Sequence, residues 1–195
     1  MSYLSQSAID EIGFLSIGKN VKISSKASIY GPDRISIGSN VRIDDYCIIS
    51  ASNREFRIGS FVHIAAYSLI VGNERVEMMD FSGLSSRVSV YSSSDDYSGT
   101  WMTNPTVPDE FTGVKHAPVT IGKHVIVGAG SIILPGSSLE EGVAVGALSL
   151  IKGRCKEFGV YFGSPAKRIS ERKKDILRLE SEFLASVMDS KGKIA

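Results

Sequence analysis

Residues 121–168 divide into eight units of six: IGKHVI, VGAGSI, ILPGSS, LEEGVA, VGALSL, IKGRCK, EFGVYF and GSPAKR. An aliphatic residue opens the first six units, and a small or medium-sized residue stands fifth in them. A six-residue period fits neither an α-helix, with about 3.6 residues per turn, nor a strand that alternates every two residues. It is typical of a parallel β-helix, in which each unit forms one short strand and one corner. Three units then close one triangular coil.

The first and fifth positions of each unit are expected to point into this triangular prism. The first-position residues are Ile121, Val127, Ile133, Leu139, Val145 and Ile151, and the fifth-position residues are Val125, Ser131, Ser137, Val143, Ser149 and Cys155. The fifth side chain must be small because the prism axis is crowded. The two cysteines, Cys47 and Cys155, both stand fifth, so we interpret them as small core residues, not as a disulfide or a nucleophile.

Four earlier coils begin at Ile17, Ile37, Ile58 and Met78. Their spacings are 37−17 = 20, 58−37 = 21 and 78−58 = 20, whereas a coil of three plain units takes 18 residues, as from Ile121 to Leu139. The extra residues fall in the third unit each time. The sequence therefore predicts a bulge repeated at one corner of the prism.

Three segments lie outside the repeat. The stretch from Asp95 to Ala117 is polar and aromatic and keeps no period, so we expect a functional loop that projects from the coil and covers a neighbouring surface. A short helix over residues 3–12 is expected to cap the first coil. A C-terminal helix with Ser170 as its N-cap is expected to pack outside the prism, with a frayed tail beyond Asp189. The expected domains are 1–14 for the cap, 15–169 for the β-helix and 170–195 for the helix and tail.

The composition excludes several classes of protein. The 22 basic residues nearly balance the 21 acidic ones and form no dense patch, which argues against a nucleic-acid partner. No stretch approaches the roughly 18 consecutive apolar residues of a membrane span. The N-terminus lacks the basic-then-apolar layout of a secretion signal, and two cysteines fit a reducing cytoplasm.

The repeats and the closing GVYFGSPAKRI resemble the hexapeptide-repeat acyltransferases, which are left-handed parallel β-helix proteins. The resemblance covers about residues 15–170 and is strongest to the acetyltransferases of galactosides and of bacterial surface-polysaccharide sugars. Their G-x-P-A-K/R-x-I ending corresponds here to Gly163, Pro165, Ala166, Lys167 and Ile169. The resemblance implies a homotrimer with an active site between adjacent subunits, acetyl-CoA as co-substrate and no metal.

Histidine is the natural general base near neutral pH, and the chain has three. His63 is the leading candidate because it stands sixth in its unit, where the side chain points away from the prism. His116 lies where the loop rejoins the repeat and is the second candidate. His124 stands at a corner and is interpreted as solvated.

The chain departs from the galactoside acetyltransferases just before the loop. Those enzymes carry their catalytic histidine there, whereas this chain reads Tyr91-Ser-Ser-Ser-Asp95-Asp96. Either His63 replaces it from another face of the cleft, or Asp95 or Asp96 is the base, or one of these carboxylates orients His63 from a neighbouring subunit. The structural alternative for the two aspartates is a capped polar turn.

The expected binding residues follow from the resemblance and from the chemistry of the ligands. Those expected to bind the acceptor are Arg87, Ser94, Tyr97, Trp101 and Asn104, since aromatic rings suit sugar surfaces and an arginine suits a nucleotide diphosphate. Those expected to bind acetyl-CoA are Gly128, Ala129, Gly146, Ala147, Lys152, Pro165, Lys167 and Arg168. Each of these residues can also have a purely structural role.

The function predicted is an acetyl-CoA-dependent sugar acetyltransferase of bacterial surface-polysaccharide (O-antigen or capsule) synthesis. Three alternatives stay open. They are an N-acetyltransferase for a nucleotide-linked amino sugar, a γ-type carbonic anhydrase with three histidines around a metal, and a catalytically silent scaffold. The sequence alone does not name the sugar or choose between oxygen and nitrogen as the acetylated atom.

Overall fold

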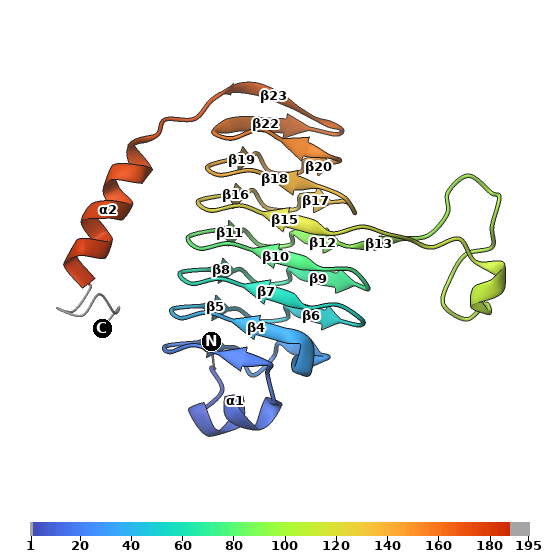
Figure 1. The fold of residues 1–195 in the computed structure, drawn as a ribbon, viewed down its shortest axis with the longest axis horizontal. Helices are drawn as coiled ribbons and strands as arrows, with labels where there is room; N and C mark the ends of the chain where they lie inside the picture. The colour runs from blue at the N-terminus through green and yellow to red at the C-terminus, as the bar shows by residue number, and fades with distance from the viewer. Residues whose placement is uncertain (1, 188–195) are drawn as a thin grey trace.

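Each six-residue unit forms one short strand and one corner, and successive coils stack into three parallel sheets (Figure 1). The computed structural model describes residues 2–187. Strands of neighbouring coils pair in register, so that Ile121 lies opposite Leu139 and Val127 opposite Val145. The parallel β-helix predicted from the six-residue period is confirmed.

The three sheets form the three faces of the prism. The first sheet contains β1 (Ser16–Ile17), β4 (Ile35–Ile37), β7 (Phe56–Ile58), β10 (Val76–Met78), β15 (Val119–Ile121), β18 (Ser138–Leu139) and β21 (Arg154–Cys155). The second contains β2 (Lys22–Ile23), β5 (Arg42–Ile43), β8 (His63–Ile64), β11 (Gly83–Leu84), β16 (Ile126–Val127), β19 (Ala144–Val145), β22 (Gly159–Gly163) and the antiparallel β23 (Ala166–Glu171). The third contains β3 (Ser28–Tyr30), β6 (Ile48–Ala51), β9 (Leu69–Gly72), β12 (Ser89–Tyr91), β17 (Ile132–Ile133) and β20 (Leu150–Ile151).

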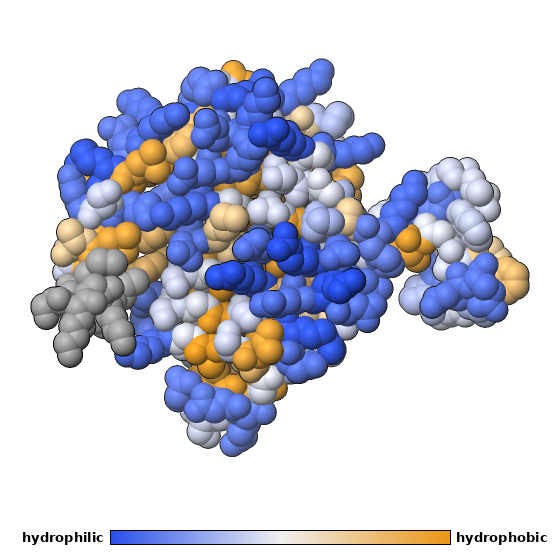
Figure 2. All heavy atoms as spheres, in the orientation of Figure 1, coloured by the Kyte–Doolittle hydropathy of each residue, from blue (hydrophilic) through white to orange (hydrophobic). Residues whose placement is uncertain are grey.

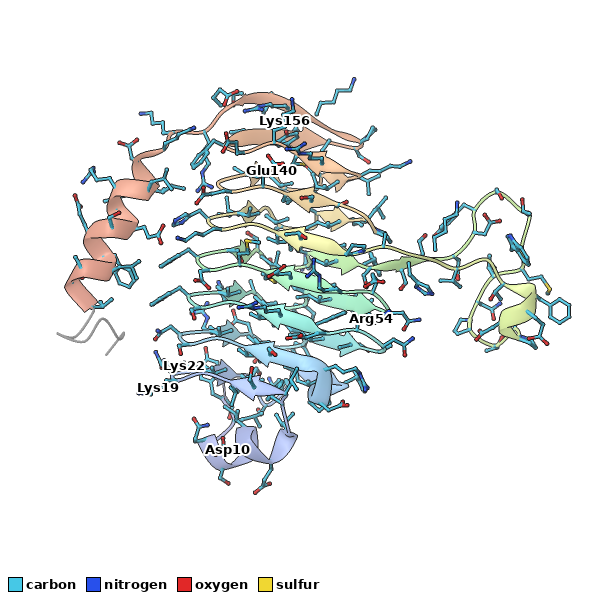
Figure 3. The ribbon with its side chains drawn as sticks, in the orientation of Figure 1. Asp10, Lys19, Lys22, Arg54, Glu140 and Lys156 are labelled. Carbon is cyan, nitrogen blue, oxygen red and sulfur yellow. The ribbon has the colours of Figure 1, made fainter. Side chains whose placement is uncertain are left out.

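The core is the column of inward side chains predicted from the repeat. Ile121, Val127 and Ile133 at first positions are fully buried, as are Ser131 and Val143 at fifth positions. Burying each large aliphatic side chain contributes about 1.5–3 kcal/mol. The outer surface carries polar side chains such as Lys19, Lys22, Arg54, Glu140 and Lys156, which Figure 3 labels.

One detail of the predicted register is wrong. Cys155 pairs with Leu139 and therefore occupies the column of first positions, because this coil takes 155−139 = 16 residues instead of 18. The shortened corner contains Gly153 in the left-handed conformation, with φ of 90°. Cys155 and Cys47 are both buried and unpaired, and burial raises the pKa of the Cys47 thiol and raises that of Cys155 to about 11. Both thiols are core groups.

We name the corners by the sheets they join. The first corner joins the first and second sheets, the second corner joins the second and third sheets, and the third corner returns from the third sheet to the first. The repeated bulge lies at the third corner, between β3 and β4, β6 and β7, and β9 and β10. The first of these bulges includes the 3-10 helix η1 (Pro32–Arg34). The predicted bulge at one common corner is confirmed.

The excursion (residues 95–117) leaves the solenoid at this same third corner and stands clear of the body of the molecule (Figures 1 and 2). Its root is a two-stranded antiparallel stem of β13 (Ser93–Ser94) and β14 (Lys115–His116). Its outer part contains the 3-10 helix η2 (Asp109–Phe111). The segment therefore has more regular structure than the sequence indicates.

Two helices flank the solenoid. α1 (Gln6–Ile12) begins at the N-cap Ser5, whose hydroxyl accepts a hydrogen bond from the Ala8 amide at 3.2 Å, and it buries Ile9 against the first coil. α2 (Asp175–Val187) packs outside the prism, as expected. The N-cap predicted at Ser170 is wrong, because Ser170 lies within β23, which extends the last coil as a hairpin with β22. The tail predicted beyond Asp189 lies outside the described residues.

Candidate active site

A groove of about 970 Å³ lies where the excursion leaves the solenoid. Its apolar wall comes from the third sheet and third corner, with Ile132, Leu134, Pro135 and Leu150. The opposite wall comes from the stem and the start of the excursion, with Ser93, Ser94, Asp95, Asp96, Tyr97, Ser98 and Lys115. Lys152 also lines the groove. The groove thus places carboxylates and amines beside an apolar surface.

Asp96 organises the root of the excursion. Both oxygens of its carboxylate accept from the Ser98 hydroxyl at 2.9 Å, and Oδ2 also accepts from the amides of Thr100 at 3.1 Å and Trp101 at 3.3 Å. The hydrogen bond from Ser98 and those from the backbone amides lower the pKa of this carboxyl. Because its lone pairs are engaged and its basicity is reduced, Asp96 has the geometry of the capped polar turn and is poorly suited to accept a proton.

Asp95 presents the opposite case. Within residues 2–187 no hydrogen bond or ion pair engages its carboxylate, although the side chain lines the groove and is half-buried. A carboxylate that is free and faces a hollow can accept a proton from a bound ligand. The two aspartates are adjacent in sequence, yet their surroundings give them different chemistry.

The three histidines lie apart. His116 is on the stem with Nδ1 2.8 Å from the Ser93 hydroxyl, and its neighbours Lys115 and Ala117 line the groove while His116 does not. His63 is on β8 in the second sheet, so one chain does not bring it together with Asp95 or Asp96. Within one chain the three histidines thus lie on separate faces and share no common point at which a metal could bind.

His63 has an acidic partner that the sequence analysis missed. Its Nε2 lies 2.8 Å from Oδ2 of Asp44, whose side chain is almost fully buried, and 2.8 Å from Nη2 of Arg42. Arg42 also pairs with Asp44, Nε to Oδ1 at 3.0 Å. The expected orientation of His63 by a carboxylate is thus available from its own chain. The sequence could have indicated that this segment lies beside His63, because Arg42 and His63 occupy the same position of consecutive coils.

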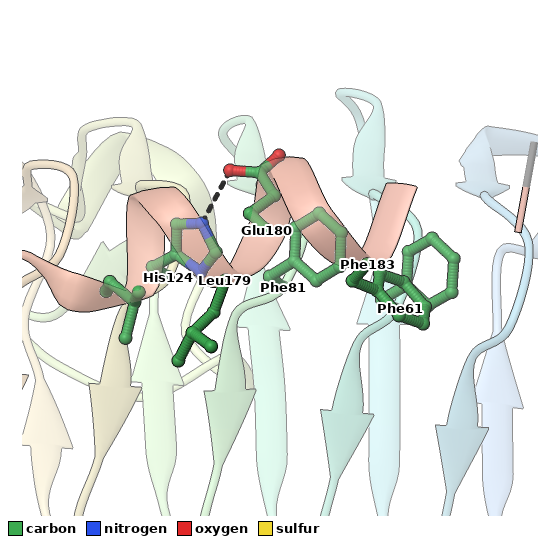
Figure 4. Close-up of a pocket in the computed structure, with 7 residues that line it drawn as sticks. Phe61, Phe81, His124, Leu179, Glu180 and Phe183 are labelled. Atoms are coloured by element: carbon green, nitrogen blue, oxygen red, sulfur yellow. Dashed lines mark hydrogen bonds and ion pairs between the residues drawn. The ribbon is translucent and has the colours of Figure 1, made fainter. Parts of the chain in front are cut away.

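The interpretation of His124 as a solvated corner is wrong. Its side chain is only 10% exposed, its Nε2 lies 2.8 Å from Oε2 of Glu180 on α2, and its ring stacks on Phe81 at 5.1 Å. A hollow of about 370 Å³ lies here between α2 and the first corner, and Figure 4 shows the residues that line it. Burial opposes ionisation of Glu180, but hydrogen bonds from Lys123 and His124 outweigh it and lower the pKa of that carboxyl. This cluster docks α2.

The predicted acceptor residues fall into three places. Ser94 and Tyr97 line the groove. Trp101 packs over Gly113 within the excursion, and Asn104 closes a turn there by accepting from the Thr106 amide at 3.0 Å. Arg87 is at the second corner, away from the groove, with its backbone in the left-handed conformation at φ of 61°.

The predicted coenzyme residues also separate. Gly128, Ala129, Gly146 and Ala147 form the second corner of two consecutive coils. Packing explains the glycines, because a Cβ on Gly128 would lie 2.5 Å from the Ala147 amide and one on Gly146 would lie 2.2 Å from the Phe162 ring. Lys152 lines the groove. Pro165, Lys167 and Arg168 belong to the β22–β23 hairpin, where Arg168 pairs with Glu171 at 2.7 Å.

Two further classes of feature are absent from the described part of the chain. Among residues 2–187, no three His, Cys, Asp or Glu side chains are grouped so that they could hold a metal ion. No helix within the same residues is long and apolar enough to cross a membrane.

Comparisons with known proteins place this geometry in context. No family model matches the chain. The chain is 53% identical over 188 residues to the dTDP-4-amino-4,6-dideoxy-D-glucose acyltransferase of Escherichia coli. The matched region covers 96% of this chain and 98% of that protein. The chain is 27% identical over 161 residues to the putative lipopolysaccharide biosynthesis O-acetyl transferase WbbJ of Escherichia coli strain K12, covering 82% and 72% respectively.

Two of the solved structures to which this chain is similar are of the same protein, AntD. A variant of AntD, an N-acyltransferase from Bacillus cereus, in complex with dTDP and coenzyme A, matches with a TM-score of 0.91 and 49% identity, covering 95% of this chain and 98% of that chain. AntD in complex with dTDP and 3-hydroxybutyryl-CoA matches with a TM-score of 0.92 and 50% identity, covering 95% and 97%.

Proposed function

The chain belongs to the hexapeptide-repeat acyltransferases, and from this premise we propose that it transfers an acyl group from a coenzyme A thioester to the amine of a nucleotide-linked amino sugar. The observation that carries the proposal is the identity of 53%, over nearly the full length of both chains, to an enzyme named for a dTDP-linked 4-amino sugar. This choice corresponds to the alternative of an N-acetyltransferase for a nucleotide-linked amino sugar, with the acyl group left general. AntD, the N-acyltransferase of similar fold and 50% identity, supports nitrogen as the acceptor atom.

Acyl transfer to an amine needs three contributions from the chain. The donor thioester and the acceptor amine must be held together, a base must take a proton from the amine, and a donor must steady the thioester oxyanion. The amine nitrogen bonds to the carbonyl carbon, the carbon–sulfur bond breaks, and the departing thiolate of coenzyme A takes up a proton. No covalent intermediate on the enzyme is required.

We assign the base to Asp95. Its free carboxylate lines the groove, whereas the carboxylate of Asp96 is occupied by Ser98, Thr100 and Trp101. Asp96 then holds the turn that presents Asp95. His63 with its partner Asp44, and His116 on the stem, remain candidates for the base only if a neighbouring subunit brings them to the groove.

We place the donor along the second corner and the groove. Gly128, Ala129, Gly146 and Ala147 offer backbone at the second corner, and Lys152 offers a cation at the groove wall. Lys167 on the last hairpin is a further cation for a phosphate. Pro165 lies in the same hairpin, and Arg168 is already paired with Glu171, which weakens its assignment.

We also propose that the active unit is a homotrimer. The excursion projects from the solenoid with exposed Tyr97, Met102 and Phe111, which a neighbouring subunit would cover (Figures 1 and 2). A ring of subunits would close such head-to-tail contacts. Sedimentation of the purified chain measures the subunit number directly.

The proposed setting is the bacterial cytoplasm, in the synthesis of surface polysaccharide such as O-antigen. The likeness to the putative lipopolysaccharide O-acetyl transferase supports the pathway. Two unpaired cysteines support a reducing compartment, where disulfides are rare.

The test is coenzyme A release from acetyl-CoA and from 3-hydroxybutyryl-CoA in the presence of dTDP-4-amino-4,6-dideoxyglucose. A thiol reagent can report the release, because both cysteines are buried and raise little background. The matched control acceptor is dTDP-6-deoxyglucose, which carries a hydroxyl in place of the amine. Turnover with the amine alone is the expected result. Turnover with the hydroxyl compound would favour O-acyl transfer, and binding of neither coenzyme A nor acceptor would overturn the enzyme assignment.

A further inference from the structure

We propose that Arg172 is a positioning residue for the acyl donor, because it ties the last hairpin, β22–β23, to the first corner of the solenoid. This assignment rests on the proposed function, which places Lys167 of that hairpin near a phosphate of the coenzyme. Arg172 does not line the groove that contains Asp95. Its effect on acyl transfer would therefore pass through the hairpin.

The outer strand of the hairpin gains little from burial. β23 is the last strand of the second sheet, and its antiparallel pairing with β22 is irregular between Val160 and Tyr161. Every residue of β23 except Ala166 is exposed, and Ile169 is 64% exposed. Two-stranded hairpins are at best marginally stable without a buried face. The position of β23 therefore depends on its hydrogen bonds to β22 and on what holds its end.

Arg172 directly follows β23 and holds that end. Its amide donates to the carbonyl of Phe158 at 2.7 Å. Its Nη1 donates to the carbonyl of His124 at 2.7 Å and to that of Gly142 at 3.0 Å. The three acceptors are first-corner residues in the left-handed conformation, with φ of 47°, 58° and 70° for Phe158, His124 and Gly142. One residue thus joins the first corners of three successive coils.

The surroundings of the Arg172 side chain make this a specific attachment. The residue is half-buried, and burial lowers the pKa of its guanidinium, although such a group stays charged in proteins. No residue among 2–187 forms an ion pair with it. Hydrogen bonds from a charged donor are among the stronger ones, and here they join the charge to the two carbonyls.

The C-terminal strap (residues 172–187) continues along the same corner. On α2, Glu180 binds the ring of His124 at 2.8 Å, and Phe183 further along the helix meets the ring of Phe81 (Figures 1 and 4). His124 is therefore held twice by the strap, through its carbonyl and through its ring. The end of the hairpin and the helix share one point of attachment.

The hairpin contacts a segment assigned to the coenzyme. Phe162 of β22 lies opposite Lys167 of β23, and the Phe162 ring covers Gly146 so closely that a Cβ there would lie 2.2 Å from it. The proposed donor site uses both the Gly146-Ala147 backbone and the Lys167 amine. The distance between these two parts depends on where the hairpin lies, so its anchor at Arg172 would set the affinity for the coenzyme.

The test compares Arg172→Ala and Arg172→Lys with the unaltered full chain. Titration calorimetry gives the Kd for coenzyme A and for dTDP, and coenzyme A release in the presence of dTDP-4-amino-4,6-dideoxyglucose gives kcat and the KM for acetyl-CoA. Arg172→Ala should raise the Kd for coenzyme A and the KM for acetyl-CoA about two- to thirtyfold, with kcat and the Kd for dTDP unchanged. Arg172→Lys should restore part of the loss, since an ammonium also donates to a carbonyl.

The matched control is Arg178→Ala. Arg178 is an arginine of the same strap, but it is exposed and pairs with Glu182 on its own helix. This variant should leave the coenzyme affinity unchanged. Native-state hydrogen exchange then locates the effect of Arg172→Ala: the amides of β23 should lose protection, and those of β16 and β17 should keep it. If β16 and β17 also lose protection, Arg172→Lys takes the place of Arg172→Ala in the comparison.

The outcomes separate the two proposals. If the unaltered chain does not bind coenzyme A, the proposed function fails. If it binds coenzyme A, and β23 loses protection while the coenzyme affinity stays the same, Arg172 only anchors a strand and the positioning role is rejected. If the protection of β23 does not change, Arg172 is not the anchor of the hairpin and the inference is overturned while the proposed function stands.

Discussion

Phe183 is the residue through which we expect α2 to be held to the solenoid. Its ring meets Phe61 edge-on at 5.2 Å and Phe81 at 6.1 Å, and the ring of Phe81 stacks in turn on His124 (Figure 4). No residue of α2 within the described part of the chain is fully buried. The change Phe183→Ala removes the aromatic contacts of the helix with Phe61 and Phe81 and leaves the solenoid core untouched.

The size of the effect follows from the area that the ring covers. A phenylalanine side chain offers about 150–250 Å² of surface. Phe183 is 39% exposed, so roughly 90–150 Å² is covered. At about 25 cal/mol per Å², this contact contributes about 2–4 kcal/mol. Since alanine retains the Cβ, we expect the docking of α2 to weaken by about 2–3 kcal/mol, which is about 30- to 160-fold.

Native-state hydrogen exchange of the amides in α2 measures this directly. Protection should fall by that factor in α2 and stay unchanged in strands such as β16 and β17. The control is Glu182→Ala on the exposed side of the same helix, where only an ion pair with Arg178 is lost and about 0.3–0.5 kcal/mol is expected. Unchanged protection in Phe183→Ala would refute the aromatic contacts as the anchor of α2.

Three further predictions follow from the site and the packing. Asp95→Asn should lower kcat about 10²- to 10⁴-fold without lowering the melting temperature, and steady-state rates close to those of the unaltered enzyme would reject Asp95 as the base. The pKa of Glu180 is lowered by folding, so the stability it gives α2 is present above the ordinary carboxyl pKa of 4.5 and is lost as the pH falls through the lowered value. The protection of the α2 amides, relative to their intrinsic exchange rate at each pH, should therefore decrease below about pH 4.5, and this decrease should be smaller in Glu180→Gln. Gly128→Ala places a Cβ 2.5 Å from a backbone nitrogen and should cost about 1–3 kcal/mol, or roughly 2–12 °C in melting temperature, whereas Gly83→Ala, whose Cβ would meet nothing closer than 3.7 Å, should melt normally.

Much of the fold could be predicted because a solenoid repeats one local rule. That rule can be read from the sequence, because an aliphatic residue stands first and a small residue stands fifth in successive units. The excess length of three coils likewise indicated that the bulges lie at one corner. Prediction failed where the rule stops. Cys155 moved to another column because its coil is two residues short, and Ser170 continued a strand because a hairpin, not a coil, ends the stack.

The sequence by itself determined the β-helix, the point where the excursion leaves it, and the aspartate pair at that point. Those features depend on periodicity and on breaks in it, which are local. Only the tertiary structure decided which aspartate is free, because the hydrogen bonds from Ser98, Thr100 and Trp101 to Asp96 depend on how the excursion turns. It alone set His63 beside Asp44 and buried His124 against Glu180, because the first contact depends on side-chain geometry between coils and the second on how a distant helix docks. Side-chain chemistry in this chain is therefore fixed by stacking and docking, while its backbone is fixed by the six-residue period.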